Sequence, residues 1–265
     1  LIESNDISLQ EKAIKQGAFD VVCKPLSSVL LQAKVQNALI QTKAKTLVGN
    51  RAIHLQDEIQ NATKVLKNSE YELLEILGKS TNYKEHQEST HTKLIAHYAR
   101  ALARLAGLNE KIQDVAFRAS GLYDLGKVAI ADEILLKKAK LTDDEFEVVK
   151  AHARIGYDLL KYAQNGYLKA AAVISYSHHE KYDGSGYPIG LSGETIPILG
   201  RIVAIVDVFE ALTSKRVYNE LWSVEDACSF LIKEKGKHFD PLFVDLFIDN
   251  LDEMLDIKNK LNCTT

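Results

Sequence analysis

The chain has 265 residues, of which 46% are hydrophobic and 26% charged, the composition of a globular protein that buries a core. The formal net charge of −3 gives no concentrated basic surface for DNA, and the three cysteines lie far apart without a C-x-x-C pair. No apolar run reaches the roughly 18 residues of a membrane helix, and no signal peptide is recognisable, so we expect a cytoplasmic protein with neither DNA nor a membrane as a partner.

The first 26 residues predict a helix followed by a strand. Residues 8–16 suit a helix that ends at Gly17, and "FDVVC" at 19–23 predicts a short buried strand. The signature "GAFDVVCKP" resembles the end of a response-regulator receiver domain, which implies that Lys24 is the one functional position retained. We therefore expect residues 1–40 to be a small α/β receiver-like fragment of a bacterial two-component-like signalling protein, in a chain that begins without Met and is itself a fragment.

A long helix is predicted from residue 27 to residue 77, and residues 41–78 are interpreted as a helical linker with coiled-coil character. Apolar positions at spacings of four and three form a heptad seam, and Gly49-Asn50 favours a kink near its start. Two interpretations stay open: the seam packs on its own domain, or residues 48–76 pair with a second copy in a homodimer. The seam consists of Val48, Ala52, Leu55, Ile59, Ala62, Leu66, Leu73 and Ile76, with Ser69 as the break.

Residues 79–258 predict a helical bundle, and residues 259–265 a tail. Thr142 and Glu145 form a capping box that opens a helix carrying His152, and Ser223 repeats this cue before a later helix. "IPILGRIVAIVDVFEAL" is apolar nearly all round and predicts a buried central helix with Asp207 in its middle. A buried carboxylate needs a partner or a cation.

Asp124 raises the same question at the end of another apolar helical pattern. Imidazole and carboxylate ligands suit iron, manganese, zinc or nickel. A single histidine is more often a structural or surface residue, but several such groups in one helical domain favour a metal site. The candidate imidazoles are His91, His152, His178 and His179.

Three stretches occur in one order: "YDLGK" at 123–127, "HHEKYDGSGYP" at 178–188 and "ILGRIVAIVDVFEALTS" at 198–214. Together they resemble the HD-GYP family of cyclic-di-GMP phosphodiesterases across residues 85–245. The resemblance implies an all-α HD-superfamily bundle with two metal ions, iron or alternatively manganese, and Asp124 as the bridging ligand. The implied metal ligands are His91, Asp124, His152, His178, His179 and Asp207.

The resemblance also implies substrate contacts for cyclic-di-GMP or its linear product. Lys127 and Arg216 match positions that meet phosphate, and Glu210 and Tyr187 are further candidate contacts. Two cations about 3.5–4 Å apart would activate a bridging water and hold phosphate oxygens. Asp124 and Lys127 are therefore the candidate catalytic residues, with Lys127 and Arg216 neutralising the remaining charge.

The motif loop consists of Asp183, Gly184, Gly186, Tyr187 and Pro188. Both glycines predict a turn with positive φ. Two interpretations stay open: a structural loop beside the metals, or a contact surface for substrate and for proteins with GGDEF domains, which the resemblance implies as partners.

Four positions depart from the family pattern. Tyr123 replaces the His of the HD pair; it could bind ferric iron as a phenolate or turn away and leave water, and we expect a weakened site. Gln87 stands where members with a third metal have Glu, which predicts two metals. Glu210 is longer than the usual Asp, and Asn219 replaces a lysine near phosphate.

Three functional hypotheses follow from these patterns. The first is a metal-dependent cyclic-di-GMP phosphodiesterase with reduced activity. The second is a catalytically degenerate module that binds metal or nucleotide and signals through protein contacts. The third, a general HD-type nucleotide phosphohydrolase, has little support because the GYP stretch is so specific.

Overall fold

The computed structural model describes residues 7–22, 25, 27–84, 90–214 and 221–263. They form two compact units, Leu1–Asn68 and Ser69–Thr265, and the boundary falls inside one long helix. The predicted domain limits stay predictions. Predicted residues outside the described part are Lys24, Gln87, Arg216 and Asn219, so their roles also stay predictions.

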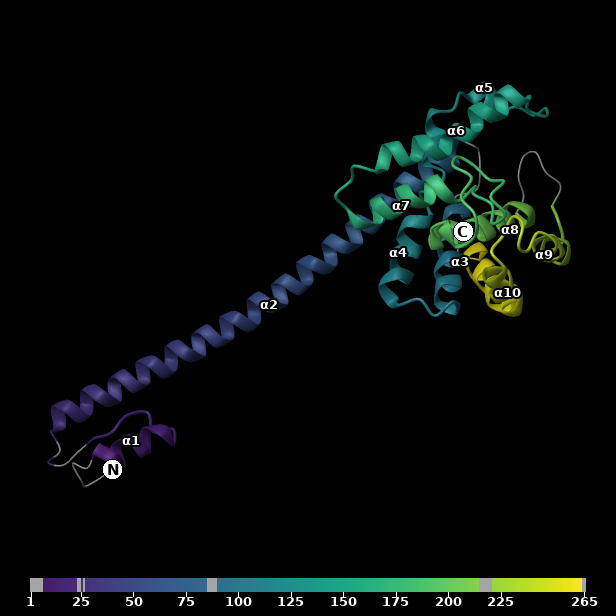
Figure 1. Ribbon diagram of the computed structural model, residues 1–265. Coiled ribbons are helices and arrows are strands. Elements are labelled where there is room, and N and C mark those ends of the chain that lie inside the picture. The colour runs from purple at the N-terminus through teal and green to yellow at the C-terminus, as the bar shows by residue number, and fades with distance from the viewer. Residues whose placement is uncertain (1–6, 23–24, 26, 85–89, 215–220, 264–265) are drawn as a thin grey trace. The chain divides into compact units, whose positions relative to one another are not determined.

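The first unit contains helix α1 (Ile7–Lys15) and most of helix α2 (Ser28–Lys84) (Figure 1). The helix stop at Gly17 is confirmed, because this glycine has a φ of +98°. The strand predicted over 19–23 is wrong for its described part, since residues 19–22 are irregular and Phe19 is 57% exposed. A strand needs a neighbouring strand for its backbone groups, and the described residues of this unit contain none. The described residues of the receiver-like fragment therefore contain helix and irregular structure but no strand.

Helix α2 continues without interruption through Gly49 and Asn50. The apolar seam is exposed in the first unit, with Val48 at 69%, Ile59 at 65% and Leu66 at 70%. No described part of the chain therefore covers the seam. None of the helices among the described residues is both long and apolar enough to cross a membrane.

The second unit is the predicted all-α bundle, and its described residues contain no strand. Its helices follow the final turns of α2 and are connected by short loops (Figure 1). They are α3 (His91–Leu105), α4 (Glu110–Ser120), η1 (Leu125–Ala129), α5 (Asp132–Leu135), α6 (Asp143–Leu160), α7 (Gly166–Ser177), η2 (Gly193–Thr195), α8 (Ile198–Thr213), α9 (Val224–Lys233), α10 (Pro241–Asp249) and α11 (Leu251–Asn262).

Local sequence determines where two of these helices begin. Before α6, the Thr142 hydroxyl accepts the Glu145 N–H, and the Glu145 carboxylate accepts the Thr142 N–H, so the predicted capping box is confirmed. Ser223 likewise accepts the Asp226 N–H before α9. Each cap satisfies N–H groups that have no partner within the helix.

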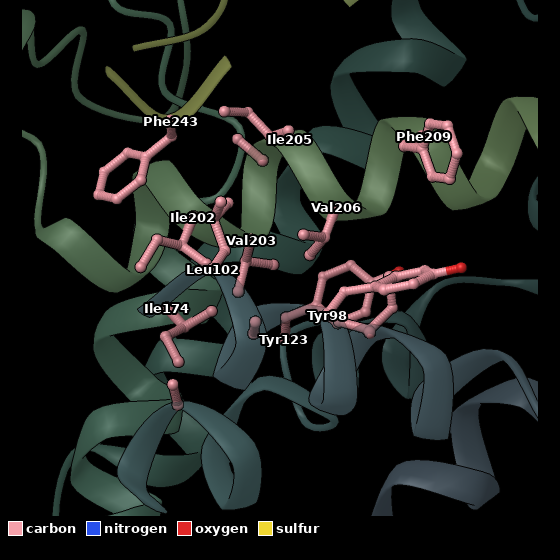
Figure 2. Packing of buried hydrophobic residues seen from close by; sticks show 14 of the residues in the cluster. Tyr98, Leu102, Tyr123, Ile174, Ile202, Val203, Ile205, Val206, Phe209 and Phe243 are labelled. Atoms are coloured by element: carbon pink, nitrogen blue, oxygen red, sulfur yellow. The ribbon is translucent and has the colours of Figure 1, made fainter. Parts of the chain in front are cut away.

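Helix α8 is the buried central helix that its apolar sequence predicts. Figure 2 shows side chains of α8, among them Val203 and Val206, packed with Leu102 and Tyr98 of α3 and with Tyr123. Full burial of one such aliphatic side chain contributes about 1.5–3 kcal/mol. This packing fixes α8, which carries Asp207 and Glu210 to the site described next.

Candidate metal centre

Four of the six predicted ligands lie together. The ligand atoms of Asp124, His152, His178 and His179 are all within 4.8 Å of one another. Asp124 directly precedes η1, His152 lies in α6, and the two adjacent histidines follow the end of α7. Three segments that are distant in sequence therefore supply one four-residue cluster.

Two glycines allow these segments to meet. A Cβ on Gly126 of η1 would lie 1.9 Å from the His152 carbonyl oxygen of α6. A Cβ on Gly156 of α6 would lie 2.0 Å from the Ser175 Oγ of α7. A larger residue at Gly126 would force the backbones of η1 and α6 apart, and one at Gly156 would displace the Ser175 side chain. These contacts therefore set the distances within the four-residue cluster.

The hydrogen bonds of two cluster histidines leave lone pairs facing each other. His152 donates from Nδ1 to the Val149 carbonyl at 2.6 Å, and His178 donates from Nδ1 to the Ser175 carbonyl at 2.9 Å. These acceptors assign the proton to Nδ1, so each Nε2 carries a lone pair. The two Nε2 atoms are 3.4 Å apart. Such an arrangement suits a bound cation, and histidine ligands of metals commonly donate their other N–H to a backbone carbonyl.

The charge states of the cluster also suit a cation. Burial opposes ionisation of Asp124, but the Lys127 ammonium at 2.8 Å holds the pKa of Asp124 well below 3.8. Burial lowers the pKa of His152 to about 4, and burial with the neighbouring imidazoles puts the pKa of His179 well below 6.5. Metals bind deprotonated ligands. The Oδ1 of Asp124 also has no hydrogen-bond donor among the described residues.

The other two predicted ligands do not join this cluster. The Tyr123 hydroxyl donates to Asp207 Oδ1 at 2.6 Å and accepts from His91 Nε2 at 2.9 Å. His91 Nδ1 in turn contacts the Glu210 carboxylate. These four side chains form a hydrogen-bonded row, which adjoins the cluster where the Tyr123 ring meets His178 edge-on at 5.0 Å.

The row shows what two departures from the family pattern do. The buried Tyr123 directs its hydroxyl to the predicted ligands His91 and Asp207, and its role toward a metal stays a prediction. Glu210, predicted to contact substrate, is 3% exposed and lies against His91. Its position suits orientation of the His91 ring, a role that sequence reasoning missed because the two residues are far apart in the chain.

Glu180 organises the motif loop, another role that sequence reasoning missed. This residue is 2% exposed, and its carboxylate accepts N–H groups of Ile189 at 2.8 Å, Gly190 at 3.0 Å and Leu191 at 2.9 Å. The loop returns along the chain so that the Tyr187 ring stacks on His179 at 4.7 Å. An acidic residue directly between a histidine pair and a glycine-rich turn was the available signal.

The glycines of the motif loop act in two different ways. Gly184 has a φ of +85°, as predicted. Gly186 has no positive φ; instead a Cβ there would lie 2.2 Å from the Lys181 nitrogen, so this prediction is corrected to a close backbone approach. Asp183 is exposed and accepts the Ser185 N–H at 2.9 Å, and Pro188 follows a cis peptide bond.

The comparisons with known proteins agree with this geometry. The sequence matches the family model described as HD domain over residues 41–242. The chain therefore belongs to the HD domain family, and its motifs are those of the HD-GYP group within it. The four-residue cluster is compatible with a divalent metal centre of that family.

Two relatives and one solved structure illustrate the similarity. The chain is 38% identical over 243 residues to the cyclic di-GMP phosphodiesterase response regulator RpfG of Xanthomonas campestris pv. campestris, covering 92% of this chain and 64% of that protein. It is 39% identical over 196 residues to the 3'3'-cGAMP-specific phosphodiesterase 2 of Vibrio cholerae serotype O1, covering 74% of this chain and 38% of that protein. The crystal structure of a cyclic GMP-AMP specific phosphodiesterase of V. cholerae has a TM-score of 0.57 at 19% identity, covering 72% of this chain and 52% of that chain, and so shares the fold.

Proposed function

We propose that this chain is a metal-dependent phosphodiesterase of the HD-GYP type that hydrolyses cyclic-di-GMP with reduced activity. The observation that carries the proposal is the pair of imidazole Nε2 atoms, of His152 and His178, at 3.4 Å beside the Asp124 carboxylate. Membership of the HD domain family and the activity named for RpfG support the substrate. The chain spans 64% of that relative's length, so the activity of the whole protein is part of the proposal.

Iron, or alternatively manganese, would be held by Asp124, His152, His178 and His179, and His91 with Asp207 would serve a second ion. Two bound cations supply a water of lowered pKa and positive charge for the phosphate oxygens. Lys127 would contact the same phosphate, because its ammonium lies 2.8 Å from the proposed metal ligand Asp124 and its side chain remains 15% exposed. Tyr187 holds the His179 ring in place by stacking on it.

Reduced activity follows from the hydrogen-bonded row. A second ion at His91 and Asp207 must displace the Tyr123 hydroxyl from both. A neutral phenol is also a costly ligand, because its pKa is about 10. The second metal position is therefore the weaker of the two.

The same row supports a second candidate function, a degenerate module that binds metal or nucleotide without hydrolysis. The Tyr123 hydroxyl bridges His91 Nε2 and Asp207 Oδ1, so these two atoms have a partner without a second ion. Such a module would signal through protein contacts at the motif loop. Partners with GGDEF domains and a cytoplasmic location stay predictions.

The test is hydrolysis of cyclic-di-GMP by the chain loaded with Fe²⁺ or Mn²⁺ under anaerobic conditions, with product separation by chromatography. We expect slow turnover that Asp124→Ala abolishes. His54→Ala is the control, because His54 is exposed and pairs with Glu58 one turn along α2. Nucleotide binding without turnover would favour the degenerate module, and turnover of 3'3'-cGAMP alone would refute the proposed substrate.

We also propose a homodimer through residues 48–76. The seam repeats at heptad spacing, and its larger residues Leu55, Ile59 and Leu66 are exposed at 42%, 65% and 70%. Ile59→Lys places a charge in the seam and is expected to give monomers in sedimentation equilibrium. Asp57→Lys, two positions away and outside the seam, should leave the dimer intact, and monomeric wild-type protein would refute the pairing.

A further inference from the structure

The last turns of α2 contact both ends of segment 121–130, the stretch that contains Tyr123, Asp124 and Lys127. These turns belong to the same compact unit as the four-residue cluster. The contacts involve Lys84 at one end of the segment and Gly78 at the other. They give α2 a direct physical connection to the residues proposed to hold metal and phosphate.

Lys84 holds the far end of the segment. Its ammonium donates to the Val128 carbonyl at 2.9 Å and to the Ile130 carbonyl at 2.5 Å, and lies 3.3 Å from Asp132 Oδ1. Carbonyls at the end of a helix have no donor within it, and an ammonium offers three donors. The lysine side chain is only 22% exposed. Lys84 therefore fixes the end of η1 with interactions that the short helix cannot provide.

Gly78 holds the near end of the segment by backbone contact. A Cβ on Gly78 would lie 2.6 Å from the Gly121 carbonyl oxygen. Gly78 and Lys84 are six positions apart in the helix, which is about 9 Å along α2. The helix thus spans the segment from one end to the other.

Both partners of this contact are rigidly placed. On α2, the Tyr71 ring stacks on Phe117 of α4 at 5.3 Å, and Leu74 is buried in the core. In the segment, Gly126 has no room beside the His152 carbonyl. A displacement of η1 therefore changes the distances between Asp124 and the cluster histidines rather than being absorbed locally.

We propose that Lys84 is a positioning residue, which fixes η1 so that Asp124 and Lys127 face the histidines of the four-residue cluster. The inference rests on the proposed function for its effect on catalysis. Its effect on metal affinity does not depend on any particular substrate. Lys84 itself touches neither the cluster nor the proposed phosphate position.

The test compares Lys84→Met with a matched control in the full chain, using Mn²⁺ alone as the probe in calorimetry. Methionine keeps the apolar stem and removes the donors, so the dissociation constant for Mn²⁺ is expected to rise about tenfold, the usual effect of losing a group that orients a ligand. Lys79→Met should leave it unchanged, because Lys79 pairs with Glu75 on the surface of α2. Lys84→Arg, which retains two-point donation, should stay near wild type.

Hydrogen exchange distinguishes a positioning role from a purely structural one, because a purely structural role would not change amide exchange selectively in η1. Amides of residues 125–130 should exchange faster in Lys84→Met, with α7 and α8 unchanged. Gly78→Ala should weaken Mn²⁺ binding in the same way, whereas Gly49→Ala, with open space around it, should not. This second pair keeps the proposal testable if Lys84→Met does not fold.

Wild-type Mn²⁺ affinity and wild-type exchange in Lys84→Met would overturn the proposal. A lower melting temperature with unchanged Mn²⁺ affinity would overturn it equally, because Lys84 would then only stabilise the end of α2. If the wild-type chain hydrolyses no cyclic-di-GMP while the Mn²⁺ effect is present, the proposed function fails and the positioning role stands.

Discussion

Replacing Tyr123 by histidine should strengthen the second metal position. The Tyr123 hydroxyl now joins His91 Nε2 at 2.9 Å and Asp207 Oδ1 at 2.6 Å, and it occupies the space between them. A histidine is shorter, and metal–imidazole bonds are about 2.0–2.1 Å long. Tyr123→His therefore both vacates this space and adds a nitrogen ligand beside it.

The magnitude follows from the two hydrogen bonds that an ion must break in the wild-type chain. A neutral hydrogen bond contributes about 0.5–1.5 kcal/mol net, and one to a charged carboxylate about 1.5–3 kcal/mol. Losing both opposes metal binding by about 2–4.5 kcal/mol, or roughly 30- to 2,000-fold in the dissociation constant. We expect Tyr123→His to tighten the second ion by at least this factor and to raise turnover.

The assay is metal content per chain, by mass spectrometry after dialysis at fixed free Mn²⁺, supported by calorimetry. Tyr123→Phe is the matched control, because it removes the hydroxyl without adding a ligand and should give intermediate affinity. If Tyr123→Phe binds the second ion more weakly than wild type, Tyr123 is itself a ligand and the reasoning is refuted. Equal affinity in all three proteins would show that the row does not oppose metal binding.

Three further predictions concern the surroundings of the cluster. Glu180→Gln removes the charged acceptor of three loop N–H groups and should lower the free energy of unfolding by about 2 kcal/mol, measured by urea denaturation. Gly126→Ala places a Cβ 1.9 Å from the His152 carbonyl and should cost about 1–3 kcal/mol with loss of Mn²⁺ binding in calorimetry. Burial, and after it the positive charge of Lys181, lowers the pKa of His238 from 6.5 to about 4. The stability that the neutral His238 ring contributes is therefore full above pH 6.5 and is lost as pH falls toward 4. His238→Phe should make unfolding free energy less dependent on pH by about 2 kcal/mol between pH 7.5 and 5, measured by denaturation at each pH.

Each of these predictions has a control or a contrary outcome. Glu194→Gln, at an exposed position of the short helix η2, should leave stability unchanged. Gly49→Ala should not destabilise, because its Cβ meets nothing within 4 Å. A wild-type pH profile for His238→Phe would show that this ring does not stay neutral in the folded chain. Unchanged Mn²⁺ affinity in Gly126→Ala would contradict the packing argument for the cluster.

Local signals in the sequence predicted the bundle well. The capping box at Thr142 and the all-round apolar pattern of α8 act within one helix, so neither needs knowledge of the fold. The predicted strand at 19–23 was wrong for its described part because a strand depends on a neighbour, and the described residues of the first unit provide none. Gly186 was misinterpreted for a similar reason, since its constraint comes from Lys181 rather than from its own φ.

Residue order named the candidate ligands but not how they divide in space. The motif named six candidates, and the structure brings four together while His91 and Asp207 bind Tyr123. That division depends on where one hydroxyl lies relative to residues 32 and 84 positions away. No local pattern contains such a distance.

The division of the candidate ligands into the four-residue cluster and the hydrogen-bonded row also separates two proposed properties of this chain, metal binding at the cluster and hydrolysis. The four-residue cluster is assembled through Gly126 and Gly156, whose contacts do not involve Tyr123. Tyr123 packs in the core beside α8 (Figure 2). Its hydroxyl reaches His91 and Asp207. A change at residue 123 can therefore alter the proposed second metal position while the four-residue cluster keeps its geometry. Metal binding at the cluster and hydrolysis should vary independently among variants of this residue, as expected of a site that departs from its family at one ligand.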